Sequence, residues 1–209
     1  MLSLPAEWSQ GQHLAIIGQT GTGKTTLARA ILDTRTYLLA LQSKERAKVE
    51  YGGIRVKRAR DMDRLTATRV ELRPPYERQY EEFATALIKA YHQGGWTIYL
   101  DELYYLDQLG LSPFIDRILT QGREDKLTIV SGMQRPVKVT RFAISQSTHV
   151  VSFHLEGRDA KTLADATTPR LEEIVSDLGE HEFVWYKQPA TLWRGKLDMR
   201  AHALVGEEI

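Results

Sequence analysis

The chain has 209 residues, 42% of them hydrophobic and 26% charged, and its formal net charge is +1. These values are ordinary for a globular protein in water, and no apolar stretch reaches the length of a membrane span. Because the chain has no cysteine, disulfides, zinc ribbons and thiol nucleophiles are excluded, and the N-terminal residues show no secretory signal.

The first predicted elements are a buried strand over residues 13–17 and a helix over residues 26–32. Between them, residues 18–25 (GQTGTGKT) fit the Walker A or P-loop pattern G-x-x-x-x-G-K-[ST]. The glycines let backbone N–H groups close around phosphates, the lysine reaches the β- and γ-phosphates, and the next hydroxyl ligates Mg²⁺. The sequence therefore predicts a nucleoside triphosphate site with Mg²⁺. The expected contacts are Gly18, Thr20, Gly21, Thr22, Gly23, Lys24, Thr25 and Thr26, with Thr25 on the metal.

A second strand is predicted over residues 37–41, and a half-exposed edge strand over residues 54–57 follows a turn or mobile loop at residues 51–53. From Lys44 to Arg73, ten basic residues outweigh five acidic ones, which gives this stretch a net charge of +5. This asymmetry indicates either a polyanionic partner or a solvated surface that binds nothing.

Aromatic and apolar residues at helical spacing predict a helix over residues 76–91, and a strand follows over residues 96–100. Asp101 and Glu102 come directly after this strand, which is the Walker B form. Asp101 can hold the Mg²⁺ hydration shell, and Glu102 can orient and deprotonate the attacking water. The second acid favours hydrolysis over binding alone; the alternative is an acid pair that caps a helix.

The next predicted elements are a helix from Ser112 to Gly122 and a strand over residues 127–130. A polar side chain just beyond this strand can reach the γ-phosphate or the attacking water. Ser131 and Gln134 are the candidates, and we favour Gln134 because its amide both donates and accepts hydrogen bonds. The alternative is an amide that stabilises a turn.

The last third predicts a strand over residues 149–155, helices over residues 159–166 and 169–178, and a hairpin of residues 183–186 and 191–193. Strands that alternate with helices predict a doubly wound, mainly parallel α/β fold with helices on both faces of the sheet. We expect a single domain over residues 1–209, with a motif-bearing core of about residues 12–165. The hairpin and tail show no motif that assigns them a role.

These motifs together resemble the FtsK–HerA superfamily of DNA-pumping P-loop ATPases. The resemblance rests on the two Walker motifs, on Gly122-Arg123 before an apolar strand, on Gln134-Arg135-Pro136 after it, and on residues 151–159. It covers roughly residues 12–165. The compact size is most similar to the genome-packaging ATPases of viruses with an internal membrane.

The resemblance implies a ring-forming homo-oligomer that hydrolyses ATP with Mg²⁺ and translocates double-stranded DNA into a capsid, with capsid vertex proteins as further partners. It also implies an arginine finger, and Arg123 matches that position; Arg158 is a second candidate, and Arg135 matches a structural partner of a carboxylate. The expected location is the cytoplasm, of the host if the protein is viral, or the virion. Met133 departs from the family, which often carries threonine there, and the absence of membrane and DNA-reading domains favours a minimal motor.

Residues 51–60 are the candidate loop for the DNA channel, with Lys57, Arg58 and Arg60 for phosphate contacts. Two alternatives stay open. A small-molecule kinase would use residues 55–73 as an arginine-bearing lid, although the Asp-Glu pair and Gln134-Arg135-Pro136 argue against it. A nucleotide-gated switch would bind a protein partner instead of DNA.

Overall fold

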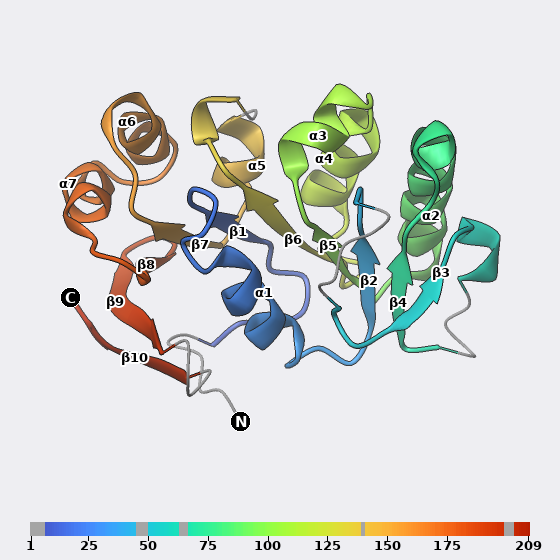
Figure 1. The fold of residues 1–209 in the computed structure, drawn as a ribbon, viewed down its shortest axis with the longest axis horizontal. Coiled ribbons are helices and arrows are strands. Elements are labelled where there is room, and N and C mark those ends of the chain that lie inside the picture. The colour runs from blue at the N-terminus through green and yellow to red at the C-terminus, as the bar shows by residue number, and fades with distance from the viewer. Residues whose placement is uncertain (1–6, 45–49, 63–66, 139–140, 199–202) are drawn as a thin grey trace. The chain divides into compact units, whose positions relative to one another are not determined.

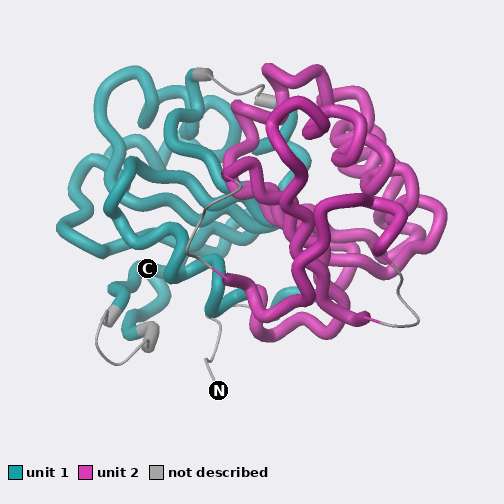
Figure 2. Tube along the Cα trace, turned by 45° about the vertical axis from the view of Figure 1, so that its right-hand side comes forward, with its two compact units in different colours: residues 1–9, 13–31, 132–209 teal, residues 10–12, 32–131 magenta. Residues whose placement is uncertain are grey.

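The computed structural model describes residues 7–44, 50–62, 67–138, 141–198 and 203–209 (Figure 1). Contacts divide the chain into two compact units (Figure 2). The first unit comprises residues 1–9, 13–31 and 132–209, and the second comprises residues 10–12 and 32–131.

The first unit holds five strands in the spatial order β10-β9-β8-β7-β1. β1 and β7 are parallel, with Leu14 opposite His149, whereas the pairs β7–β8, β8–β9 and β9–β10 are antiparallel. The strands are β1 (Leu14–Ile17), β7 (His149–Phe153), β8 (Glu182–Lys187), β9 (Thr191–Asp198) and β10 (Ala203–Glu208). The helices are α1 (Lys24–Leu32), η3 (Pro136–Lys138), α5 (Arg141–Ser145), α6 (Gly157–Ala166) and α7 (Arg170–Asp177).

The second unit is parallel throughout, in the spatial order β6-β5-β2-β4-β3. The strands are β2 (Leu38–Leu41), β3 (Ile54–Val56), β4 (Arg69–Leu72), β5 (Thr97–Leu100) and β6 (Thr128–Met133), whose last two residues belong to the first unit. The helices are η1 (Ala59–Asp61), η2 (Tyr76–Arg78), α2 (Gln79–Gln93), α3 (Leu103–Gln108) and α4 (Ser112–Gln121).

Continuous apolar runs form the buried strands in both units. β1, β2 and β5 are buried at every position, which is typical of parallel strands covered on both faces. Phe153, Phe183 and Trp185 are fully buried in the first unit, and Phe83 and Trp96 are fully buried in the second. The core of each unit therefore consists of these strands and the aromatic side chains packed against them.

The mainly parallel α/β fold and the C-terminal hairpin β8–β9 confirm the sequence predictions. Six of the described elements were not predicted: β4, α3, α5, β10 and the short helices η1 and η3. β4 contains the charged residues Arg69 and Glu71, so its sequence does not show the apolar pattern of a strand, although three of its four residues are buried. The single-domain organisation stays a prediction.

Candidate active site

The P-loop lies where the sequence predicts it, between the end of β1 at Ile17 and the start of α1 at Lys24. Gly23 has φ +108°, and a Cβ atom there would lie 2.7 Å from Leu197 Cδ1, so no other residue fits this position without a shift. The N-terminal N–H groups of α1 have no partners within the helix and suit an anion. The loop therefore has the backbone geometry that a phosphate group needs.

Side chains of the P-loop stabilise its own turn. The Thr22 hydroxyl donates to the Gln19 carbonyl at 2.9 Å, and the Lys24 ammonium donates to the same oxygen at 2.7 Å. Lys24 is thus held against the loop, with its charge beside the α1 N-terminus. Thr25 and Thr26 lie half-buried in the first turn of that helix.

Residues near the C-terminal strands contact the P-loop, and the sequence analysis did not predict this. Leu197 of β9 packs against Gly23, and His181 Nδ1 lies 3.2 Å from the carbonyl oxygen of Thr22. Phe153 of β7 packs against Gly18 so closely that a Cβ atom on Gly18 would lie 2.8 Å from the Cβ atom of Phe153. The final segment of the chain is therefore part of the loop's framework.

A cavity of about 380 Å³ adjoins the P-loop within the first unit. Its lining comes from residues 19–22, from Phe153 and His154 after β7, and from residues 178–182 between α7 and β8. Such a volume lies within the range of small-molecule sites. The Gly179 N–H and the Arg194 guanidinium, each 2.9 Å away, lower the pKa of Glu182 and keep this wall of the cavity charged.

Gln134 lies beside the P-loop, although 114 residues separate it from Thr20. It follows β6 directly, and the Gly18 N–H donates to the carbonyl of the preceding Met133 at 3.1 Å. The Thr20 hydroxyl lies 3.4 Å from Gln134 Oε1. Ser131, by contrast, is buried within β6. Gln134 is thus the better placed of the two candidates.

A carboxylate in α6 fixes the segment that follows Gln134. Arg135 Nε donates to Asp159 Oδ2 at 2.9 Å, and the Val137 N–H donates to Asp159 Oδ1 at 3.2 Å. Asp159 is buried, whereas the Arg135 side chain is 54% exposed, so the contact is partly buried. The interpretation of Arg135 as a structural partner of a carboxylate is confirmed.

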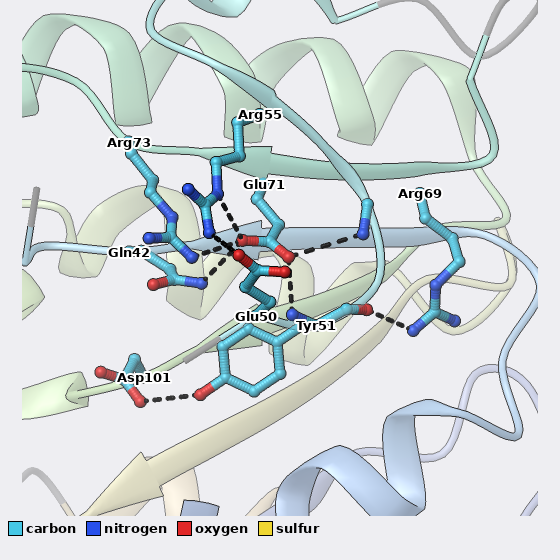
Figure 3. Close-up of polar contacts among 9 residues, drawn as sticks. Gln42, Glu50, Tyr51, Arg55, Arg69, Glu71, Arg73 and Asp101 are labelled. Atoms are coloured by element: carbon cyan, nitrogen blue, oxygen red, sulfur yellow. Dashed lines mark hydrogen bonds and ion pairs between the residues drawn. The ribbon is translucent and has the colours of Figure 1, made fainter. Parts of the chain in front are cut away.

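In the second unit, Asp101 follows β5, and two tyrosines orient its carboxylate. The Tyr99 hydroxyl donates to Asp101 Oδ1 at 3.1 Å, and the Tyr51 hydroxyl donates to the same oxygen at 3.3 Å (Figure 3 shows the Tyr51 contact). Burial is the main cause that raises the pKa of both tyrosines, so they stay protonated donors at neutral pH. Asp101 Oδ2 has no hydrogen-bond partner among the residues that the structure describes.

This donor arrangement suits a hydrated Mg²⁺ ion. Mg²⁺ bound with a nucleotide keeps several waters and takes only one or two carboxylates besides the phosphates. Within the described ranges, no group of three or more acidic or histidine side chains forms a metal cage. Asp101 Oδ2 is a ligand of the type that such an ion uses, and a threonine hydroxyl such as that of Thr25, in the first unit, is another.

Glu102 is the last residue before α3, in extended backbone and half-buried. Its carbonyl accepts from the Leu106 N–H at 3.3 Å, so the new helix fixes its backbone. Asp101 and Glu102 belong to the second unit and the P-loop to the first. Their action on one nucleotide stays a prediction.

The remaining predicted residues are basic. Arg123 is exposed and forms no ion pair with any described residue. Lys57 and Arg60 are exposed, Arg58 is half-buried, and Arg60 lies 3.6 Å from Asp61. These side chains are accessible, but their roles stay predictions.

Part of the basic stretch from Lys44 to Arg73 serves the interior rather than a surface. Arg73 is 5% exposed and pairs with Glu71 at 2.6 Å, and Arg69 donates to the carbonyls of Leu32 and Arg35. Three further basic residues, Arg46, Lys48 and Arg64, lie outside the described residues. Neither interpretation of the charge asymmetry foresaw this internal use.

The α/β fold and the P-loop are those of the P-loop NTPase fold class. No protein-family model matches the chain. It is 28% identical over 173 residues to the DNA packaging ATPase P9 of Enterobacteria phage PRD1. The aligned region covers 78% of this chain and 74% of P9.

Solved structures share the fold at low sequence identity. The genome packaging NTPase B204 of Sulfolobus turreted icosahedral virus 2 matches with a TM-score of 0.72 and 17% identity, over 90% of this chain and 96% of B204. EssC of Geobacillus thermodenitrificans matches with a TM-score of 0.61 and 10% identity, over 90% of this chain and 40% of EssC. The resemblance to viral genome-packaging ATPases is thereby confirmed by P9, and B204 and EssC share the fold.

Among the helices that the structure describes, none has both the length and the apolar character needed to cross a membrane.

Proposed function

We propose that this protein is an ATP-hydrolysing motor that packages double-stranded DNA into a viral capsid. The observation that carries the proposal is the similarity to packaging ATPase P9 over about three quarters of each chain. The P-loop, with Gln134 beside it, supplies the chemistry that such a motor needs. B204, which shares the fold, has been solved with AMPPCP and with ATP-γS.

The nucleotide lies with its phosphates on the P-loop and its nucleoside in the adjoining cavity of about 380 Å³. Lys24 neutralises the β- and γ-phosphates, while Thr25 and Asp101 hold Mg²⁺, which screens the phosphate charge. Glu102 takes a proton from the attacking water, and Gln134 contacts the γ-phosphate or that water.

The motor acts as a ring of identical subunits, in which Arg123 reaches the nucleotide of its neighbour. Arg123 suits this role because it is exposed and has no ion-pair partner in the described parts of the chain. Lys57, Arg58 and Arg60 contact DNA phosphates, which carry no sequence information and suit a motor that moves along any sequence. Capsid vertex proteins are further partners, and the protein acts in the host cytoplasm or on the virion.

An arginine finger in trans predicts a specific complementation. Arg123→Ala should lower kcat on the order of 10³-fold or more, since the guanidinium stabilises charge on the transferred phosphoryl group. Subunits with Arg123→Ala, mixed with subunits that carry Lys24→Ala, should regain part of the hydrolysis rate. Wherever the P-loop of an Arg123→Ala subunit faces a Lys24→Ala subunit, an intact P-loop meets an intact finger. The same mixture made with Arg158→Ala tests the second candidate, and recovery there alone would reassign the finger.

The proposed function is tested by steady-state ATP hydrolysis with and without long double-stranded DNA. DNA should stimulate hydrolysis at about 50 mM salt and much less at about 200 mM, because phosphate contacts release counterions. An ATP hydrolysis rate that does not change when DNA is added would contradict the proposal that the protein is a DNA-translocating motor. ATP consumption that needs a small-molecule acceptor would indicate a kinase instead.

A further inference from the structure

Tyr51, in the second unit, is held at three points. Its N–H donates to Glu71 Oε1 at 2.6 Å, its carbonyl accepts from Arg69 Nη2 at 2.5 Å, and its hydroxyl donates to Asp101 Oδ1 (Figure 3). The side chain is 2% exposed, and its ring lies 4.7 Å from the ring of Tyr99. These contacts hold both the backbone and the ring of Tyr51.

Glu71 provides the firm end of this arrangement. It is 1% exposed on β4 and also accepts from Arg73 at 2.6 Å and from Gln42 at 3.2 Å. A buried carboxylate is costly unless charge and hydrogen bonds compensate it, and here both do. The Gly53 N–H lies 3.5 Å from the same carboxylate. The contacts of Glu71 therefore fix the position of the backbone from Tyr51 to Gly53, where the next segment of the chain starts.

Residues 52–58, which we call the basic segment, run from Tyr51 to a second anchor. Gly53 packs on β4 so closely that a Cβ atom would lie 2.8 Å from the Arg69 carbonyl carbon. β3 then pairs with β4, and the Ala59 N–H donates to Glu82 Oε2 at 2.7 Å. Lys57 and Arg58, both expected on DNA, lie between the two anchors.

The Tyr51 hydroxyl is the side-chain contact that joins the start of this segment to the carboxylate expected on the metal. Tyr99 meets the same oxygen and packs on the Tyr51 ring, but it lies on β5, two residues before Asp101, and not at the start of this segment. Asp101 Oδ2 has no partner among the described residues, so the tyrosines hold one oxygen and leave the other for a metal-bound water. Because the carboxylate is planar and rigid, any turn of Oδ2 toward a ligand also moves Oδ1.

We propose that Tyr51 is a positioning residue that couples occupancy of the Asp101 site to the basic segment. The proposal rests on the proposed function, because it takes Asp101 as the residue that faces Mg²⁺ with a nucleotide. A fixed carboxylate gives the Tyr51 hydroxyl a fixed acceptor, and the basic segment is ordered with it. By linkage, a ligand on the basic segment strengthens nucleotide binding by the same factor.

Hydrogen exchange of the amides of residues 52–58 tests the coupling directly. In the wild-type protein, saturating Mg²⁺–AMPPCP should slow this exchange at least about fivefold, the lower end of typical couplings between sites. Tyr51→Phe keeps the ring and its packing and removes only the hydroxyl, so the exchange should no longer depend on the nucleotide. Tyr99→Phe is the matched control, because it removes the other hydroxyl from the same oxygen and should keep the dependence.

Three outcomes decide the proposal. The proposal is overturned if the nucleotide slows the exchange of residues 52–58 equally in the wild type and in Tyr51→Phe. It is also overturned if the nucleotide does not change this exchange in the wild type. Loss of the effect in Tyr51→Phe alone, with exchange elsewhere in the sheet unchanged, supports it.

Binding of double-stranded DNA, measured with and without Mg²⁺–AMPPCP, separates this proposal from the proposed function. The affinity for DNA should rise with nucleotide in the wild type and not in Tyr51→Phe. If the wild type binds no DNA while the exchange result holds, the coupling stands and the assignment of DNA as the partner fails.

Discussion

Lys24→Ala is expected to weaken ATP binding roughly 10- to 100-fold and to abolish turnover at ordinary ATP concentrations. The ammonium makes charge-assisted contacts to the β- and γ-phosphates, and each such contact is worth about 1.5–3 kcal/mol. In the protein, Lys24 already lies over the P-loop through its bond to the Gln19 carbonyl, so its loss should cost contacts rather than folding. Calorimetric titration with ATP measures the change.

AMP provides the internal control for this variant. It lacks the phosphates that Lys24 contacts, so Lys24→Ala should bind AMP nearly as well as the wild type does. His181→Ala is the matched variant on the cavity wall, where the ring meets the Thr22 carbonyl. If the nucleoside lies in this cavity, His181→Ala should weaken AMP and ATP by a similar factor. Unchanged ATP affinity in Lys24→Ala would remove the central claim about the P-loop.

Local sequence patterns predicted the elements around the P-loop well, because a buried apolar strand, a glycine-rich turn and a helix are each encoded by adjacent residues. Gln134 was also foreseen, since a polar residue that follows a buried strand must emerge at the end of that strand. The structure places Gln134 Oε1 3.4 Å from the Thr20 hydroxyl of the P-loop, and its contact with the γ-phosphate or the attacking water stays a prediction. The same logic located Asp101, but it gave no hint of the hydroxyls that orient its carboxylate.

The missed features depend on contacts between distant parts of the chain. β4 reads as charged because Glu71 and the nearby arginines belong to a buried network whose partners include Gln42 and Tyr51, 29 and 20 residues away. The sequence pattern shows that these residues are charged, but it does not show the ion pairs and hydrogen bonds that compensate their burial. Likewise, nothing in the local sequence shows that Leu197 packs on Gly23 or that His181 reaches Thr22. A signal existed only in the tyrosines at positions 51 and 99, whose hydroxyls need buried partners.

Glu102→Gln is expected to lower kcat about 10²- to 10⁴-fold, the range for loss of a general base, while ATP stays bound with near wild-type affinity. The amide keeps the size and hydrogen-bonding shape of the carboxylate but cannot accept a proton from water. Burst and steady-state measurements of phosphate release, together with ATP titration, separate the two effects.

The position of Glu102 makes this test a sharp one. The residue precedes α3, and its backbone carbonyl already bonds to Leu106, so the amide should not disturb the fold. Glu173→Gln, on the exposed face of α7, removes the same charge away from the P-loop and should leave turnover unchanged. Normal turnover in Glu102→Gln would move the role of base to another group. A fall in both kcat and ATP affinity would instead place Glu102 in the metal shell beside Asp101.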